Sequence, residues 1–183
     1  MIDLTAKARI WTTQGFVDDD PWTIVESQDE LPAEGDVVVP LEAFFALSDE
    51  AHHGIGTEKG RNTRRIGVLI APDDDPAEIA DRLDEIALIT VDFPKFSDGR
   101  AFSHAALLRE RHGYAGEIRA VGDVLIDQVP LMLRVGITSF AVTNETALKR
   151  LEQKHLTGIS HHYQPTALPA KASGGYSWRR AST

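Results

Sequence analysis

The sequence predicts an α/β protein built around a mostly parallel sheet, and two observations support this fold class. From residue 36 onward, short strand-like runs alternate five times with helical stretches, which is the pattern of repeated strand–helix units. The runs 37–39 and 66–70 are almost continuously apolar, as expected of parallel strands covered on both faces. Five such units can form an open, doubly wound sheet or part of a (β/α) barrel, and we favour the open sheet slightly.

The boundaries of these elements follow from local signals. The predicted strands are 36–41, 66–72, 87–93, 117–122 and 138–143, and the predicted helices are 41–52, one that begins at 76, 99–112, 124–135 and 144–155. The second helix has the clearest start, because Asp75 suits the cap and Pro76 suits the first helical position. Its buried stripe is predicted at Ile79, Leu83 and Ile86.

Single residues mark the limits of the later helices. Gly113 is the predicted stop of the third helix, and Asn144 begins the last one. Pro130 lies within the fourth helical stretch, where it should kink the helix or shift its start.

Two segments lie outside the repeated pattern. Residues 1–35 read as a small N-terminal β unit and a loop, with Gly15 and the run Asp18–Pro21 as turn residues. Residues 158–183 are rich in Gly, Pro, Ser and Thr, which predicts an extended C-terminal tail. We therefore expect a single α/β domain over 1–157, followed by this tail.

The composition excludes several kinds of chemistry. The 183 residues include no cysteine, so disulfides, thiol nucleophiles and cysteine-ligated clusters are excluded. The adjacent histidine pairs 52–53 and 161–162 make poor chelates, and the glycines of 54–60 lack the spacing of a nucleotide-binding loop. We expect no metal and no cofactor.

The charge and hydropathy limit the partners and the location. The net charge of −9 argues against nucleic-acid and anionic-membrane binding. No apolar run approaches the ~20 residues of a membrane span, and the N-terminus does not resemble a signal peptide, so a cytoplasmic protein is expected.

The predicted tail differs in charge from the rest of the chain. It contains Lys171, Arg179 and Arg180 and no acidic residue, whereas the remaining residues carry 16 basic and 28 acidic side chains, a balance of −12. Trp178 with Arg179 and Arg180 is therefore a candidate partner-binding segment. A solvated terminus without a role is the alternative.

Candidate site residues gather where the predicted strands end. The carboxyl ends of parallel strands usually carry the chemistry of an α/β protein, and Asp92, Lys95 and Asp123 lie there. We predict these three as catalytic candidates, and Lys95, Arg100 and Arg119 as an anion clamp. The alternatives are that Lys95 or Arg100 forms an ion pair with Asp98 or Asp92, and that the aspartates are turn residues and helix caps.

Arg119 lies inside a predicted strand. A charged residue within a sheet must face a cavity, pair with a carboxylate or reach solvent. Asp92 or Asp123, on or after the neighbouring strands, is the simplest predicted partner.

Four motifs between residues 87 and 136 carry a family resemblance: FPKFSDGR (93–100), LLRERHGY (107–114), GEIRAVGDV (116–124) and DQ (127–128). The stretch resembles a bacterial family of unknown function. Its members are small cytoplasmic proteins encoded beside the sulfite or nitrite/sulfite reductase haemoprotein, and they are often labelled oxidoreductases. The residues that match its pattern are Lys95, Asp98, Gly99, Arg100, Arg111, Arg119, Gly122, Asp123, Asp127 and Gln128.

The resemblance implies a pathway, namely assimilatory sulfite reduction within sulfate assimilation and cysteine biosynthesis. We expect an accessory protein, a subunit or electron-transfer adaptor that binds the sulfite reductase haemoprotein or its electron donor. The sequence leaves open whether the protein forms a homo-oligomer. The alternatives are an enzyme or sensor that binds a sulfur oxyanion or phosphorylated metabolite at the strand ends, and a flavin- or nicotinamide-dependent reductase.

Overall fold

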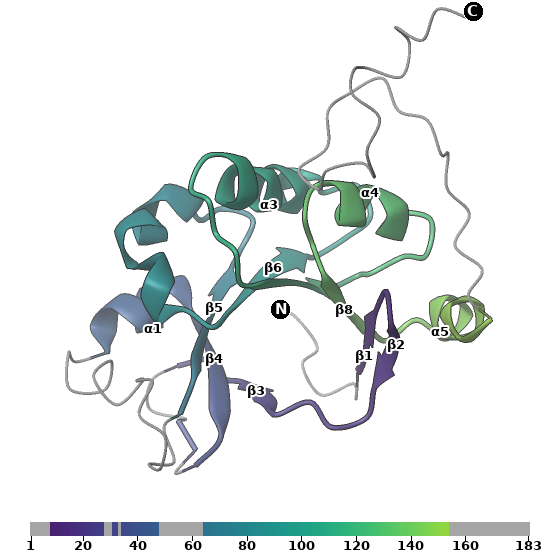
Figure 1. The fold of residues 1–183 in the computed structure, drawn as a ribbon, viewed down its shortest axis with the longest axis horizontal. Helices are drawn as coiled ribbons and strands as arrows, with labels where there is room; N and C mark the ends of the chain where they lie inside the picture. The colour runs from purple at the N-terminus through teal and green to yellow at the C-terminus, as the bar shows by residue number, and fades with distance from the viewer. Residues whose placement is uncertain (1–7, 28–30, 33, 48–63, 154–183) are drawn as a thin grey trace, which may run out of the picture.

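A single sheet of eight strands organises the molecule (Figure 1). The structure is a computed structural model, and it describes residues 8–27, 31–32, 34–47 and 64–153. The strands are β1 Arg9–Thr12, β2 Gly15–Val17, β3 Trp22–Ile24, β4 Asp36–Pro40, β5 Ile66–Ile70, β6 Leu88–Phe93, β7 Glu117–Gly122 and β8 Ser139–Val142. The helices are α1 Leu41–Ala46, the 3₁₀ helix η2 Pro76–Glu85, α3 Arg100–Glu110, α4 Val129–Arg134 and α5 Glu145–Glu152.

The strand order decides between the two predicted architectures. The order is β2-β1-β8-β7-β6-β5-β4-β3, and β3 to β8 run parallel in unbroken chain sequence. A doubly wound sheet needs a point where the order reverses, and β3 to β8 contain none. Helices α1, η2, α3 and α4 accordingly lie on the outer side of a curved sheet (Figure 1). The α/β prediction is confirmed, and the sheet is the partial barrel of the two alternatives.

The N-terminal β unit is built into both edges of this sheet. Strands β2 and β1 add antiparallel to β8 at one edge, and β3 adds parallel to β4 at the other. Only residues 18–21 connect the two edge strands β2 and β3. That linker spans at most about 18 Å, whereas the outer strands of a flat eight-stranded sheet would lie about 34 Å apart. The connection therefore requires the sheet to curl.

Alternation along the strands divides the interior into two regions. In β6, Ile89, Val91 and Phe93 belong to the hydrophobic core between the sheet and the helices. Thr90 and Asp92 are buried on the opposite, concave face. Most of the core is therefore on the helix side, and the concave face carries the buried polar residues of the strands.

The predicted helix limits are confirmed in several places. The Asp75 carboxylate accepts a hydrogen bond from Ala77 N at 2.9 Å, and the Asn144 side chain accepts one from Ala147 N at 3.0 Å. Pro130 shifts the start of α4, which begins at Val129 with the proline in its first turn. Gly113 follows α3 with a φ of 68°, a conformation that favours glycine.

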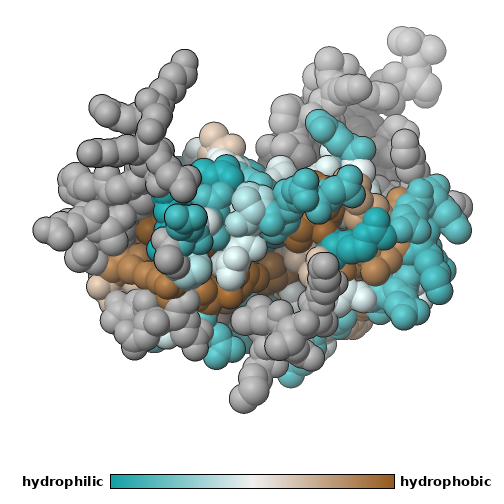
Figure 2. Space-filling view, turned by 90° about the horizontal axis from the view of Figure 1, so that it is seen from below, coloured by the Kyte–Doolittle hydropathy of each residue, from teal (hydrophilic) through white to brown (hydrophobic). Residues whose placement is uncertain are grey.

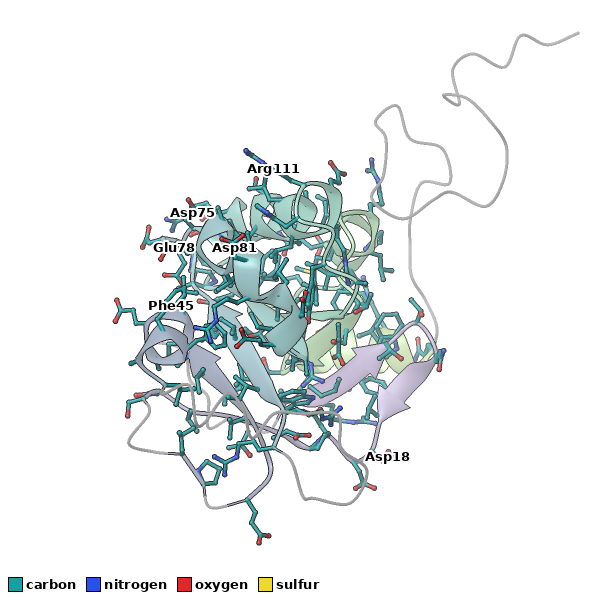
Figure 3. The ribbon with its side chains drawn as sticks, turned by 60° about the vertical axis from the view of Figure 1, so that its left-hand side comes forward. Asp18, Phe45, Asp75, Glu78, Asp81 and Arg111 are labelled. Atoms are coloured by element: carbon teal, nitrogen blue, oxygen red, sulfur yellow. The ribbon has the colours of Figure 1, made fainter. Side chains whose placement is uncertain are left out.

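The surface has both acidic and apolar regions. Phe45, Asp75, Glu78 and Asp81 point outward from α1, from η2 and from the residue that caps it (Figure 3). Seen from below, a band of hydrophobic residues crosses the molecule between hydrophilic ones (Figure 2). None of the helices in the described ranges is long and apolar enough to cross a membrane.

Candidate functional site

The loop between β6 and α3 carries the predicted cations, and one of them is paired. Arg100 donates to both oxygens of Asp98, from Nε at 3.0 Å and from Nη2 at 2.7 Å. It also forms an ion pair with Asp73, which follows β5. Arg100 therefore ties together two loops at the carboxyl ends of adjacent strands, and the ion-pair alternative with Asp98 is the one observed.

This pairing changes the acidity of its members. The hydrogen bonds from Arg100 lower the pKa of Asp98 to about 2, and the Lys95 charge acts in the same direction. The same two carboxylates raise the pKa of Arg100. Both groups are thus charged throughout the physiological pH range. The pair is a permanent feature of the rim, the name we give to the loops at the carboxyl ends of β5, β6 and β7.

The loop between β6 and α3 also exposes an aromatic side chain. Phe96 is 58% exposed, and Lys95 beside it is also exposed. Below them the loop is held in place: Gln128 Nε2 donates to Phe96 O at 3.3 Å, and the rings of Phe93 and Phe102 meet edge to face at 5.0 Å. A large apolar side chain on a supported loop is typical of a contact surface.

Asp92 is the one predicted catalytic residue that is buried. It is 4% exposed on the concave face, and its Oδ1 has no hydrogen-bond partner among the described residues. Burial raises its pKa to about 6, and the negative charge of Asp98 adds to the shift. The carboxyl group can therefore exchange a proton close to neutral pH.

Gly122 explains how Asp92 packs. A side chain at Gly122 would place its Cβ 2.4 Å from Phe93 O and 2.7 Å from the Asp92 Oδ1, and its φ is 87°. The next residue, Asp123, donates its backbone N–H to Phe93 O at 2.7 Å. The structure therefore brings Asp92 and Asp123 to neighbouring strand ends, with Lys95 outside on the exposed loop.

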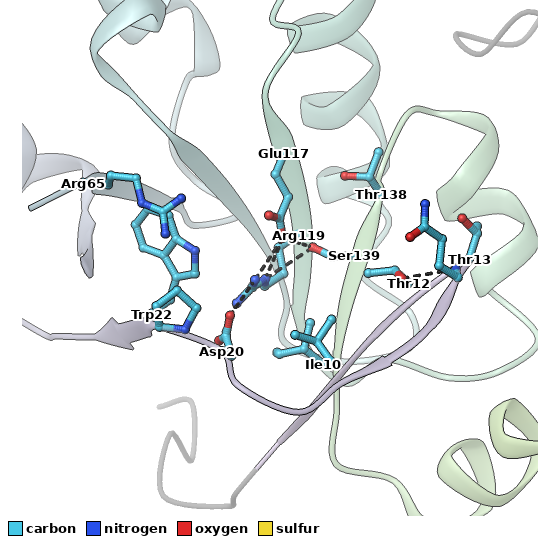
Figure 4. Close-up of a pocket in the computed structure, with 13 residues that line it drawn as sticks. Ile10, Thr12, Thr13, Asp20, Trp22, Arg65, Glu117, Arg119, Thr138 and Ser139 are labelled. Atoms are coloured by element: carbon cyan, nitrogen blue, oxygen red, sulfur yellow. Dashed lines mark hydrogen bonds and ion pairs between the residues drawn. The ribbon is translucent and has the colours of Figure 1, made fainter. Parts of the chain in front are cut away.

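Arg119 does not lie at this rim, and the prediction that it pairs with Asp92 or Asp123 is wrong. It is 6% exposed, and it donates to both oxygens of Asp20 at 2.8 and 3.0 Å, to Glu117 Oε1 at 2.9 Å and to Ser139 Oγ at 3.3 Å (Figure 4). The sheet register pairs Arg119 with Thr90, two positions before Asp92, and the carboxylates that it contacts lie towards the amino ends of the strands.

The predicted anion clamp is consequently not assembled. Arg119 faces the inside of the barrel near the amino ends of the strands, whereas Lys95 and Arg100 follow the carboxyl end of β6. Arg119 is also neutralised by Asp20 and Glu117. Arg119 therefore lies in a different part of the molecule from Lys95 and Arg100.

Three residues of the Arg119 network were missed in the sequence. Glu117 could have been found, because it shares a strand face with Arg119 by the two-residue period. Asp20 reads as a turn residue, and its approach to Arg119 depends on the linker that joins the two sheet edges. Ser139 lies on β8, beside Arg119 in the register.

The other family-pattern residues have varied surroundings. Gly99 precedes α3, Arg111 follows it, and Asp127 lies on the surface before α4. Arg109, which was not predicted, donates to the backbone oxygens of Tyr114, Gly116 and Gly136 and fixes the turn after α3. Trp178, Arg179 and Arg180 lie outside the described residues.

Comparison with known proteins identifies the family. In the part of the chain that the structure describes, no three His, Asp or Glu residues are placed to hold a metal ion. No curated protein matches the sequence. A family model described as a bacterial protein of unknown function (DUF934) matches residues 67–173, from β5 to beyond α5, and includes the rim loop and Arg119. The chain therefore belongs to this bacterial family of unknown function.

Proposed function

We propose that this protein is an accessory protein of assimilatory sulfite reduction. It would act as a subunit or electron-transfer adaptor that binds the sulfite reductase haemoprotein or its electron donor. The pathway rests on the resemblance of the motifs between residues 87 and 136, and the adaptor role is supported by the geometry of the rim. The single observation that carries it is Phe96, an exposed aromatic side chain at the crest of a supported loop.

The rim is better suited to a protein surface than to a small anion. Arg100 is occupied by Asp98 and Asp73, and Arg119 lies elsewhere. Lys95 is the remaining cation of the predicted clamp, and a single exposed lysine holds an oxyanion weakly. Phe96 with Lys95 and Arg100 around it has the composition of an interface anchor with a charged border.

The charge distribution supports a basic partner. Residues 73–85 contain seven acidic residues and one arginine, so this segment accounts for −6 of the net charge of −9. Asp75, Glu78 and Asp81 point outward in this segment (Figure 3). Complementary charge of this kind speeds the encounter between partners. Because salt screens the attraction, the affinity should fall as the salt concentration rises.

Co-purification tests the proposal. The tagged full chain is co-expressed with the sulfite reductase haemoprotein of the same genome and separated by size exclusion, with the visible spectrum recorded across the peak. We expect a shared peak that carries the haem absorbance. Separate elution at micromolar concentrations of both proteins would refute the adaptor role.

Two matched variants locate the contact. Phe96→Ala should weaken the complex at least tenfold, because a truncated anchor typically costs about 2 kcal/mol or more of binding. Phe45→Ala is the control, since Phe45 is also an exposed phenylalanine, 41% exposed, on α1 two strands away. Equal affinity of the two variants would place the contact elsewhere.

A second candidate function is an enzyme or sensor for a sulfur oxyanion or phosphorylated metabolite. Asp92 favours it, because a buried carboxyl group with an unpartnered oxygen and a pKa of about 6 suits acid–base chemistry. The unassembled clamp makes it the second choice. Calorimetric titrations with sulfite, sulfate and adenylyl sulfate test it: binding that Lys95→Ala abolishes would support this function, and binding that Lys95→Ala leaves unchanged would contradict it.

A further inference from the structure

A pocket opens at the amino ends of the strands, away from the rim. It has a volume of about 460 Å³ and lies between the β1–β2 hairpin and the linker that leads into β3 (Figure 4). Ile10, Val17, Pro21 and Trp22 supply apolar walls. The network around Arg119 lines it as well. Ligands of parallel sheets usually bind at the opposite end, so this pocket was not expected from the strand pattern.

The positive charges of this pocket are already matched. Arg119 is bound by Asp20 and Glu117, as described above. Arg65 donates from Nε to Asp36 Oδ2 at 3.0 Å, and its guanidinium stands 5.1 Å from the centre of the Trp22 ring. Among the residues that line the pocket, two arginines therefore face two carboxylates, and Arg65 is also paired with Asp36 behind it, so both cations are matched. An anion would have to displace one of these pairs.

The groups that stay available can all accept a hydrogen bond, and one of them is a carboxylate oxygen. Glu117 uses Oε1 for Arg119 and Ser139, whereas its Oε2 receives no hydrogen bond from the described residues. The Glu117 side chain is 37% exposed, so this oxygen is accessible from the pocket. The Thr13 hydroxyl and the Gln14 side-chain amide also line the pocket without hydrogen bonds to other described residues.

We infer that this pocket binds a small organic cation. An ammonium or guanidinium head would donate to Glu117 Oε2 and to the oxygens of Thr13 and Gln14. A short apolar body would lie against Ile10 and Trp22. The buried ion pairs keep Glu117 in place for this contact, because Arg119 and Ser139 both hold its other oxygen. The inference is independent of the adaptor role.

Two probes of equal length test the sign of the ligand charge. The full chain, labelled with ¹⁵N, is titrated with n-butylammonium and with butyrate while amide and indole signals are followed by NMR. We expect n-butylammonium to bind at least tenfold more tightly and to shift the Trp22 indole and the Glu117 amide. Equal or tighter binding of butyrate, or shifts confined to other regions, would overturn the inference.

Charge variants then test the contact itself. Glu117→Gln should weaken n-butylammonium at least tenfold, and Gln14→Glu should tighten it several-fold. Gln14 is an exposed hairpin residue, so the second variant is informative even if Glu117→Gln fails to fold. Glu110→Gln, on the exposed side of α3, is the control and should leave the affinity unchanged. If Gln14→Glu and Glu110→Gln bind alike, the pocket is not the cation site.

Discussion

Two arginines, Arg100 and Arg119, hold pairs of carboxylates at opposite ends of the same sheet. The Arg100 side chain is 50% exposed, and its partners Asp98 and Asp73 belong to surface loops. The Arg119 side chain is 7% exposed, and it joins β7 to the linker between the sheet edges through Asp20. Water reaches the guanidinium of Arg100 and is kept away from that of Arg119, although Asp20 and Glu117 keep 24% and 37% of their side chains exposed and Asp98 only 9%. The same chemistry therefore produces a replaceable surface feature in one place and a structural bond in the other.

The difference also separates the two proposed sites. At the rim, the charges surround an exposed ring and stay accessible to a protein partner. In the pocket, both arginines are paired with carboxylates of the same chain, and acceptors remain for a ligand. Four substitutions test how far the two regions differ.

The largest effect is expected from Arg119→Met. It leaves Asp20 and Glu117 facing each other without their cation, and breaking a buried pair in this way costs about 3–5 kcal/mol of unfolding free energy. Urea denaturation followed by circular dichroism measures it. Arg119→Lys keeps the charge and should recover part of the loss. A cost below about 1 kcal/mol for Arg119→Met would show that the linker is held by other contacts.

The next effect is expected from Gly122→Ala. The new Cβ would meet Phe93 O at 2.4 Å, and the φ of 87° is unfavourable for alanine, so a loss of about 2–4 kcal/mol follows. Gly113→Ala is the matched control, because its φ is 68° but no atom lies within 4 Å of the added carbon. It should cost only about 1 kcal/mol. Similar losses for the two variants would contradict the close packing of Asp92 against β7.

A smaller, pH-dependent effect is expected from Asp92→Asn. The pKa of Asp92 is about 6 in the folded protein and 3.8 as the ordinary value, so the unfolded chain loses this proton first as the pH rises. The contribution of Asp92 to stability therefore falls between about pH 4 and pH 6. Above that range the asparagine variant should be more stable by about 1–3 kcal/mol. Parallel pH profiles of thermal unfolding for the two proteins would contradict the raised pKa.

The smallest effect is expected from Arg100→Ala. Its guanidinium is half-exposed and Asp73 is 90% exposed, so solvent screening should keep the loss of unfolding free energy at neutral pH the smallest of the four. The loss should vanish as the pH falls to about 2, where Asp98 is protonated with or without Arg100, and the pKa of Asp98 should rise from about 2 towards its usual range, as an NMR titration of the carboxyl signal would show. A large loss of stability would mean that the rim loops depend on this arginine as the barrel depends on Arg119.

Much of the fold could be predicted because its signals are local. The apolar run of β5, the cap at Asp75 and the stop at Gly113 each depend on a few consecutive residues. The rim loop was located for the same reason, since it directly follows β6. Its ion pair between Asp98 and Arg100 spans two positions in the chain and was among the predicted alternatives.

The contacts of Arg119 show where sequence reasoning ends. Its partner Asp20 is 99 positions away, and nothing near Asp20 in the sequence distinguishes it from a turn residue. Asp92 and Asp123 were predicted as partners because they are close in the strand pattern. The observed register and the direction of the side chain exclude them.

The α/β class, the order of the strand–helix units and the family motifs can be read from the sequence alone. The tertiary structure was needed to show that the sheet curls, that residues 8–24 supply the strands at both of its edges, and that Arg119 belongs to a pocket at the amino ends of the strands. The physical reason is the range of the interactions. Backbone propensity and capping act over a few residues, whereas curvature depends on which strands pair and on how short the chain between the two edges is.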